Sequence, residues 1–313
     1  MTTLSQSTAA NTAITNTAMT TTAIAQTVFL NGQWLPIDEA RIPILDRGFI
    51  FGDGIYEVVP FYSGVPFRWA EHRARMSRSL AKIRLTDPYT DQEWEALVHR
   101  IVAMHPWTDQ FVYLHITRGV AKRDHAFPAN VVPTVLAIAN PFPVTPAIQR
   151  SEGVAAVTLL DTRWLQCDIK SISLLGNVLA RQAAVDEGAM ECVMFRDEYL
   201  TEGSAANIWV VKNGKLLSPP RDNKMLEGIR VALVDSLCKA KGIPLEVRPV
   251  TRAEVLNADE LMLSSATKEV LPICKLDGKP VGLGKPGPVY TAIYAAYQEQ
   301  IQAAIQSAKQ QKL

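Results

Sequence analysis

Lys170 lies about thirty residues before the segment Thr201-Glu202-Gly203-Ser204-Ala205-Ala206-Asn207, which stands between two strand-like stretches. A lysine can form a Schiff base with an aldehyde, and a carboxylate such as that of Glu202 can keep a pyridine nitrogen protonated. Small residues let backbone N–H groups approach a phosphate. These are the requirements of pyridoxal phosphate chemistry. Alone, however, the segment is better explained as a polar surface loop, so the surrounding sequence must decide.

Two more stretches could contact a phosphate. Gly228 follows a loop containing Pro219 and Pro220 and opens an expected helix at Ile229-Arg230. The free N–H groups of a helix N-terminus bind anions. Ser264-Ser265-Ala266-Thr267 ends an expected strand with small and hydroxyl-bearing residues. Plain helix starts and polar strand ends are common, so neither stretch identifies a site by itself.

The elements that must position these residues fall into two groups. In the first, turn residues and apolar spacing predict hairpins over 28–36 and 56–67, helices over 69–83 and from a cap at Asp91, and strands over 110–116 and 133–139. Strands, then helices, then strands predict a small α+β domain over residues 28–141, with an α/β sandwich-like form.

The proline-rich stretch Asn140–Pro146 predicts an extended connection, and we place a linker at 142–150. Beyond it, strands are predicted over 153–160, 191–195, 207–211, 215–217, 261–265 and 271–276, with helices over 174–187, 228–241 and 289–304. The second group therefore predicts a larger, β-rich, cofactor-binding domain over residues 151–313. The whole chain is expected to be a two-domain α+β protein.

Composition excludes several classes of function. The 313 residues are 48% hydrophobic and 20% charged, with a formal net charge of +1. This balance gives no reason to expect nucleic acid or a membrane as partner, and no apolar run approaches ~20 residues. Four widely spaced cysteines suggest no metal site or disulfides, so we expect a cytoplasmic location. Residues 1–27 carry no charged side chain and predict a disordered tail.

Together these pieces resemble the class IV (fold-type IV) aminotransferases over residues 28–300. The matching positions are Glu202, Ser204, Asn207, Ile208, Trp209, Leu216, Ser218, Leu226, Gly228 and Ile229. The chain departs from the family pattern in Trp209, where Phe or Tyr is usual, and in Ser218, where Thr is usual. The basic residue after the Gly-Ile pair comes one place early, as Arg230, and Ala266 replaces an expected hydroxyl residue.

The resemblance implies pyridoxal 5'-phosphate as cofactor and a role for individual residues. Lys170 would be the Schiff-base lysine, Glu202 would bind the pyridine nitrogen, and Leu226 would lie against the cofactor ring. The residues at the cofactor phosphate would be Arg75, the backbone amides of Ile229 and Arg230, Ser265 and Ala266.

Within the family, the chain is most similar to the D-amino-acid aminotransferases, in the stretches 46–59, 117–125, 167–171 and 174–180. Tyr56, Arg123 and His125 would bind the substrate carboxylate, a planar group that suits a guanidinium and a phenol. The predicted reaction moves an amino group from D-alanine or a similar D-amino acid to the keto acid 2-oxoglutarate. A homodimer is also implied, in which the Arg123 loop completes the neighbouring site.

Four alternatives remain at this point. A branched-chain L-amino-acid aminotransferase, an aminodeoxychorismate lyase and an amine transaminase belong to the same family, and the Arg123-x-His125 pair favours the D-amino-acid prediction over them. A non-catalytic protein that binds pyridoxal phosphate belongs to a different class. The presence of both Lys170 and Glu202 argues against it.

Overall fold

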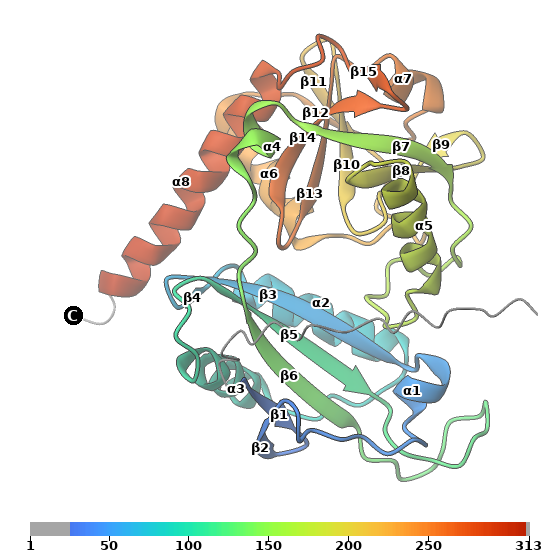
Figure 1. Ribbon diagram of the computed structural model, residues 1–313, viewed down its shortest axis with the longest axis vertical. Helices are drawn as coiled ribbons and strands as arrows, with labels where there is room; N and C mark the ends of the chain where they lie inside the picture. Colours follow the sequence, from blue (N-terminus) through green and yellow to red (C-terminus); the bar gives the residue numbers. More distant parts are fainter. Residues whose placement is uncertain (1–25, 311–313) are drawn as a thin grey trace, which may run out of the picture.

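The computed structural model describes residues 26–310 and arranges them around two β-sheets (Figure 1). The strands of the first sheet lie between residues 27 and 141, and those of the second between 154 and 280. We therefore propose the predicted division into domains at 28–141 and 151–313, joined by 142–150. Most of the predicted tail 1–27 lies outside the described residues, but Thr27 already begins the first strand.

The first sheet has six antiparallel strands in the order β2-β1-β6-β5-β3-β4. Its strands are β1 (Thr27–Leu30), β2 (Gln33–Pro36), β3 (Gly54–Tyr62), β4 (Val65–Pro66), β5 (Gln110–Thr117) and β6 (Thr134–Pro141). The predicted hairpins are confirmed. Asn31 and Gly32 both have positive φ, 49° and 88°, which is the backbone that a tight hairpin turn requires.

Three helices accompany this sheet: α1 (Arg47–Phe51), α2 (Trp69–Lys82) and α3 (Asp91–Ala103). The prediction that Asp91 caps α3 is wrong by one residue. Thr90 is the cap, because its hydroxyl accepts from the Glu93 N–H while the Glu93 carboxylate accepts from the Thr90 N–H. Met76 of α2 and Trp94 of α3 are buried in the apolar cluster of this sheet, which holds α2 in place.

The second sheet is mixed, with the strand order β12-β11-β10-β13-β14-β7-β8-β9 and β15 paired to β14. Its strands are β7 (Val154–Leu160), β8 (Glu191–Arg196), β9 (Tyr199–Leu200), β10 (Asn207–Lys212), β11 (Lys215–Ser218), β12 (Leu245–Val247), β13 (Glu260–Ser265), β14 (Glu269–Leu276) and β15 (Lys279–Pro280). β7 runs parallel to β14 and β8, and β11 runs parallel to β12.

The helices of this part are α4 (Ala147–Ser151), α5 (Leu175–Asp186), α6 (Ile229–Lys241), α7 (Arg252–Leu256) and α8 (Pro288–Gln310). The predicted linker is not extended throughout, since α4 begins inside it directly after Pro146, the last proline of the stretch 140–146. α6 ends at Gly242 with φ of 66°, which confirms the predicted stop. α8 is longer than predicted. In residues 26–310 no helix is long and apolar enough to cross a membrane.

The two sheets are joined by residues that cross between them. Tyr62 and Phe67 come from the first part but pack among side chains of α6 and α8. The Tyr62 hydroxyl donates to Glu269 Oε1 at 3.0 Å, and Arg150 of α4 pairs with the same carboxylate at 2.8 Å. The chain segment between β7 and α5 lies at this junction, with Ile169 packed into the core of the first sheet.

Candidate active site

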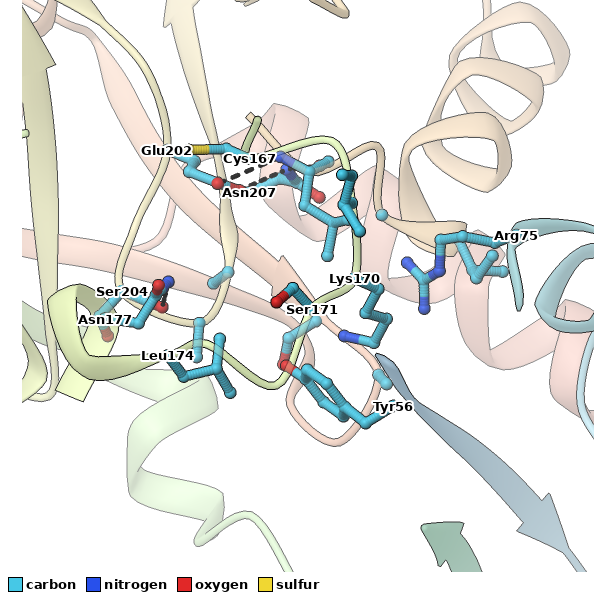
Figure 2. A pocket seen from close by; sticks show the side chains of 18 of the residues that line it. Tyr56, Arg75, Cys167, Lys170, Ser171, Leu174, Asn177, Glu202, Ser204 and Asn207 are labelled. Atoms are coloured by element: carbon cyan, nitrogen blue, oxygen red, sulfur yellow. Dashed lines mark hydrogen bonds between the residues drawn. The ribbon is translucent and has the colours of Figure 1, made fainter. Parts of the chain in front are cut away.

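A cavity of about 790 Å³, including its mouth, opens between the two parts of the molecule. It is lined from α2, the segment before α5, the loop before β10, the start of α6 and the end of β13. Nine of the predicted site residues line it: Tyr56, Arg75, Lys170, Glu202, Leu226, Ile229, Arg230, Ser265 and Ala266. Figure 2 shows the Lys170 amine facing the cavity beside Tyr56.

The backbone fixes Lys170 against β3. The Tyr56 N–H donates to the Lys170 carbonyl at 3.0 Å, and the Lys170 N–H donates to Ser79 Oγ at 3.2 Å. An isolated bridge between Ile55 and Ser171 continues this attachment. The Lys170 Nζ lies 4.0 Å from the centre of the Tyr56 ring. The amine is therefore held at a defined place in the cavity, next to a phenol.

Glu202 forms the acidic end of the cavity. Its side chain is nearly fully buried, and its Oε1 accepts from Arg163 Nη1 at 2.5 Å and from the Leu226 N–H at 3.1 Å. The second oxygen, Oε2, has only a long contact of 3.4 Å to Asn207 Nδ2. Burial raises the pKa of Glu202 to about 7, while the Arg163 guanidinium lowers it. Oε2 therefore remains able to accept a further hydrogen bond.

The sequence alone did not point to Arg163. Its guanidinium also binds both carboxylate oxygens of the buried Asp161, at 2.9 Å each. Burial works against the charge of Arg163, but its bonds to Asp161 and Glu202 raise its pKa above the usual value. Arg163 is therefore the cation that opposes protonation of the buried Glu202. Nothing in its neighbourhood in the sequence distinguishes it from a surface arginine.

Arg75 belongs to a buried cluster at the opposite end. Its Nε and Nη2 donate to the two oxygens of Glu57 at 3.0 and 2.5 Å, and His72 Nδ1 lies 3.0 Å from the same carboxylate. Burial opposes the charge on Glu57, yet Arg75 and His72 hold its pKa well below the usual range. Burial also lowers the pKa of His72, to about 4, so the ring is neutral at pH 7. Glu57 was not predicted, although an acid amid the apolar residues of 55–59 is an unusual strand residue.

The start of α6 lies at the same end as Arg75. Gly228 is the N-terminal cap, and no side chain caps the helix. A Cβ at Gly228 would stand 2.2 Å from Asn207 Oδ1, so this close approach requires glycine. The Asn207 amide in turn donates to the Leu226 carbonyl at 2.8 Å. Packing against Asn207 therefore requires glycine at 228, and the absence of a capping side chain leaves the first N–H groups of α6 free to bind an anion.

Arg123 and His125 are not brought into this cavity by their own chain. Both are exposed on the loop between β5 and β6, and both lie near the Phe51 ring, each at 5.4 Å. Arg47 Nη1 donates to the Asp124 carbonyl at 2.6 Å and so ties the loop to α1. Of the three predicted carboxylate-binding residues, only Tyr56 lines the cavity.

The residues present fit pyridoxal phosphate. One lysine, Lys170, faces the cavity among its described lining residues. A buried carboxylate with a free oxygen, Glu202, suits a protonated ring nitrogen. Arg75 and the α6 N-terminus suit a phosphate, and buried N–H groups of Arg230 have no partner in the described part of the chain.

Comparison with known proteins agrees with this assignment. The family model for amino-transferase class IV matches residues 54–276. A D-alanine aminotransferase from Bacillus licheniformis is 38% identical over 275 residues, which cover 88% of this chain and 96% of that protein. Among solved structures, the branched-chain amino acid aminotransferase of Escherichia coli has a TM-score of 0.83 at 24% identity, covering 88% of this chain and 94% of the other.

A second branched-chain amino acid aminotransferase, from T.th. and solved with N-(5'-phosphopyridoxyl)-L-glutamate, has a TM-score of 0.81 at 24% identity over 88% of this chain and 93% of that one. The chain thus belongs to the class IV aminotransferases. It is an enzyme that depends on pyridoxal phosphate, and its fold is the predicted fold-type IV. The non-catalytic alternative is excluded.

Proposed function

We propose that this aminotransferase moves the amino group of D-alanine, or a similar D-amino acid, to 2-oxoglutarate. The observation that carries the proposal is the 38% identity to a D-alanine aminotransferase across 88% of the chain. The two branched-chain aminotransferases are only 24% identical to this chain. At that identity the similarity shows the shared fold, and it does not favour a branched-chain substrate. We also propose a cytoplasmic location, which four free, buried cysteines support.

Each residue of the cavity has a defined task in this proposal. When bound, pyridoxal phosphate supplies the aldehyde that accepts the amino group and a ring that stores electrons from the substrate α-carbon. Lys170 Nζ moves the proton at that carbon, because it is the amine in the lining. Glu202, whose protonation Arg163 opposes, would hold the ring nitrogen protonated. Leu226 would lie against the ring, and Arg75, Ile229, Ser265 and Ala266 would bind the phosphate end.

We further propose that the enzyme is a homodimer and that the loop carrying Arg123 and His125 enters the partner's cavity. α1, α5 and this loop lie on the same side of the molecule (Figure 1). That side exposes large apolar side chains, with exposed fractions from 56 to 78%: Ile44, Phe49, Leu165, Leu175, Val178 and Leu179. Several large apolar side chains exposed on one side of a protein are typical of an interface.

A mixed dimer tests the origin of the loop. Lys170→Ala and Arg123→Ala subunits, each nearly inactive alone, are combined and assayed. If the loop acts across the interface, one site of each mixed dimer has both Lys170 and Arg123, and activity returns. If activity does not return although mixed dimers form, the loop acts in its own chain. A monomer by light scattering rejects the dimer.

The substrate proposal is tested by adding single amino acids to the purified holoenzyme. D-alanine is expected to bleach the visible absorption band of the cofactor, because its amino group is transferred, and L-alanine is expected to leave the band unchanged. L-leucine serves as the comparison for a branched-chain enzyme. Bleaching by L-leucine without bleaching by D-alanine contradicts the proposal. Turnover with 2-oxoglutarate as the acceptor then identifies the second substrate.

A further inference from the structure

The connection between β5 and β6, residues 118–133, lies within the described part of the chain and forms neither a helix nor a strand. Connections of this length without secondary structure are usually either functional or disordered. Every side chain from 122 to 127 is exposed, including those of Arg123 and His125. These side chains bury little surface that could hold the loop in one shape, so other groups must fix its conformation.

One buried guanidinium reaches the backbone of this loop. Arg47, at the start of α1, is 3% exposed, and its two terminal nitrogens face three successive carbonyls. Nη1 donates to the carbonyl of Asp124 at 2.6 Å and to that of Ala126 at 3.4 Å, and Nη2 donates to the carbonyl of His125 at 3.5 Å. Because these carbonyls belong to the backbone around His125, the guanidinium fixes the direction in which the side chains of Arg123 and His125 project.

Asp53 holds this guanidinium in place and joins it to a second one. Its Oδ2 accepts from Arg47 Nε at 2.7 Å and from Arg118 Nε at 2.8 Å, and its Oδ1 accepts from Arg118 Nη2 at 3.0 Å. Burial raises the pKa of Asp53, but the bonds to Arg118 and Arg47 outweigh burial and lower it below the usual value. Asp53 is therefore a carboxylate at pH 7, and charged hydrogen bonds of this kind are strong.

Arg118 contacts the next part of the same loop. It is 3% exposed, and its guanidinium lies 3.7 Å from the centre of the Phe127 ring, within the range of a cation–π contact. Its Nη2 also donates to the carbonyl of Ile83, directly after α2, at 2.7 Å. The two arginines thus hold consecutive parts of the loop, and Asp53 fixes them relative to each other.

We propose that Asp53, through Arg47 and Arg118, positions the loop so that Arg123 and His125 bind the substrate carboxylate. This role rests on the carboxylate-binding role proposed above for Arg123 and His125. Asp53 and its two arginines do not line the cavity of their own chain, so they act through the loop as positioning residues. The competing explanation is that the three residues only stabilise this end of the first sheet.

The test compares two amino donors that differ in the carboxylate. D-alanine and D-alaninamide have nearly the same shape and the same configuration, but only D-alanine carries the negative charge. The rate at which each donor bleaches the visible cofactor band of the full-length holoenzyme is measured at several concentrations, and the ratio of the two rate constants is the preference for the acid. Asp53→Asn is expected to lower this preference by about tenfold. Arg123→Ala removes the guanidinium itself and should lower it by about a hundredfold.

Hydrogen exchange follows the loop without any substrate. In Asp53→Asn the backbone amides of residues 122–127 should exchange at least about tenfold faster, whereas those of β5 should not change. Arg47→Lys keeps the charge but cannot bond all three carbonyls, so it should change both measurements in the same direction by less. The matched control is Asp87→Asn, because Asp87 also pairs with an arginine, Arg73 at 2.7 Å, and lies outside the cavity. It should leave both measurements unchanged.

A lower preference for the acid together with faster exchange supports the positioning role. The role is overturned if Asp53→Asn slows both donors equally or keeps the preference, because the three residues then only stabilise the fold. If Asp53→Asn does not fold, an unchanged preference and unchanged exchange in Arg47→Lys overturn it. A failure of the proposed function gives a different result. D-alanine then does not bleach the wild type, or Arg123→Ala keeps the full preference, and the positioning role is rejected with it.

Discussion

The two ends of the cavity are built from the same parts but leave different charges facing the ligand. At one end Glu202 and at the other Glu57 are buried carboxylates bonded to an arginine at 2.5 Å. Glu202 keeps one oxygen toward the cavity, whereas both oxygens of Glu57 are taken by Arg75. The first end therefore accepts hydrogen bonds, whereas the second donates them through the uncapped start of α6.

This difference sets the direction of a ligand with a basic nitrogen at one end and a phosphate at the other. In a buried site the effective dielectric is low, so the balance of a few neighbouring charges decides which group is stable there. The Lys170 amine lies between the two ends, beside Tyr56. A substitution in the Arg163–Glu202 pair should therefore affect catalysis most, whereas a substitution in the Arg75–Glu57 pair should affect stability most.

The largest effect is expected at the lysine between the ends. Lys170→Ala should lower turnover by at least about a thousandfold, because no other lysine among the described lining residues can move the α-proton. Both ends of the cavity stay intact in this variant, so it should still bind the cofactor. The absorbance of the cofactor that stays with the protein after gel filtration measures this binding. Lys212→Ala, at an ion pair with Asp259, is the control and should stay active. Full activity of Lys170→Ala contradicts the site.

At the accepting end, Glu202→Gln should lower kcat by about a hundredfold or more. The amide cannot hold the ring nitrogen protonated, which removes stabilisation that is specific to the transition state. Steady-state kinetics with D-alanine measure the loss, and circular dichroism controls for folding. A rate within about threefold of the wild type would mean that Glu202 is only a structural loop residue. It would also contradict the assignment of this end of the cavity as the one that accepts a hydrogen bond from the ligand.

Arg163→Gln changes the same end indirectly. The opposing cation is removed while burial remains, so the pKa of Glu202 should rise above about 7. Because activity needs the carboxylate, the acid limb of the kcat/KM profile should move to higher pH. Activity at pH 7 should fall about fivefold for the first unit of pKa increase and about tenfold for each further unit. Arg150→Gln provides the control profile. A loss of activity that is equal at every pH indicates a purely structural role for Arg163.

At the donating end, Glu57→Gln should act on stability more than on chemistry. It removes the carboxylate partner of buried Arg75 and should cost about 3 kcal/mol of unfolding free energy. The pKa values of Glu57 and His72 are both lowered in the fold. The unfolded state therefore binds more protons below about pH 6.5, and stability falls as the pH falls.

Glu57 contributes to this loss only around and below its ordinary pKa of about 4.5. Denaturant unfolding at pH 5 and pH 3.5 therefore measures its share, and the Glu57→Gln variant should lose less stability between the two than the wild type. Glu260→Gln is the control, since this buried carboxylate accepts from the backbone N–H groups of Val289 and Tyr290 rather than from an arginine. It should keep the wild-type difference between the two pH values. If the pH dependence of the unfolding free energy is unchanged in Glu57→Gln, the cluster of Glu57, His72 and Arg75 does not cause the loss of stability in acid.

Much of the local structure could be predicted because its causes are local. Asn31-Gly32 fixes a hairpin and Gly242 ends α6 through backbone conformations that few residue types adopt. The short helix α4 was missed because the prolines before it indicate an extended chain. Arg163 and Glu57 were missed for another reason. Each acts through a partner far along the chain, Glu202 and Arg75, so no short motif identifies it.

The sequence by itself determined which groups are available: the lysine, the carboxylate, the uncapped start of α6 and an early arginine at position 230. It also carried the family membership, because the residue types of the motif are required by close packing such as that of Gly228 against Asn207. Only the tertiary structure decided which charges cancel and which face the ligand. Ionisation in a buried site depends on neighbours that folding brings together, and Arg163, Glu57 and Arg230 become distinguishable from surface residues only there.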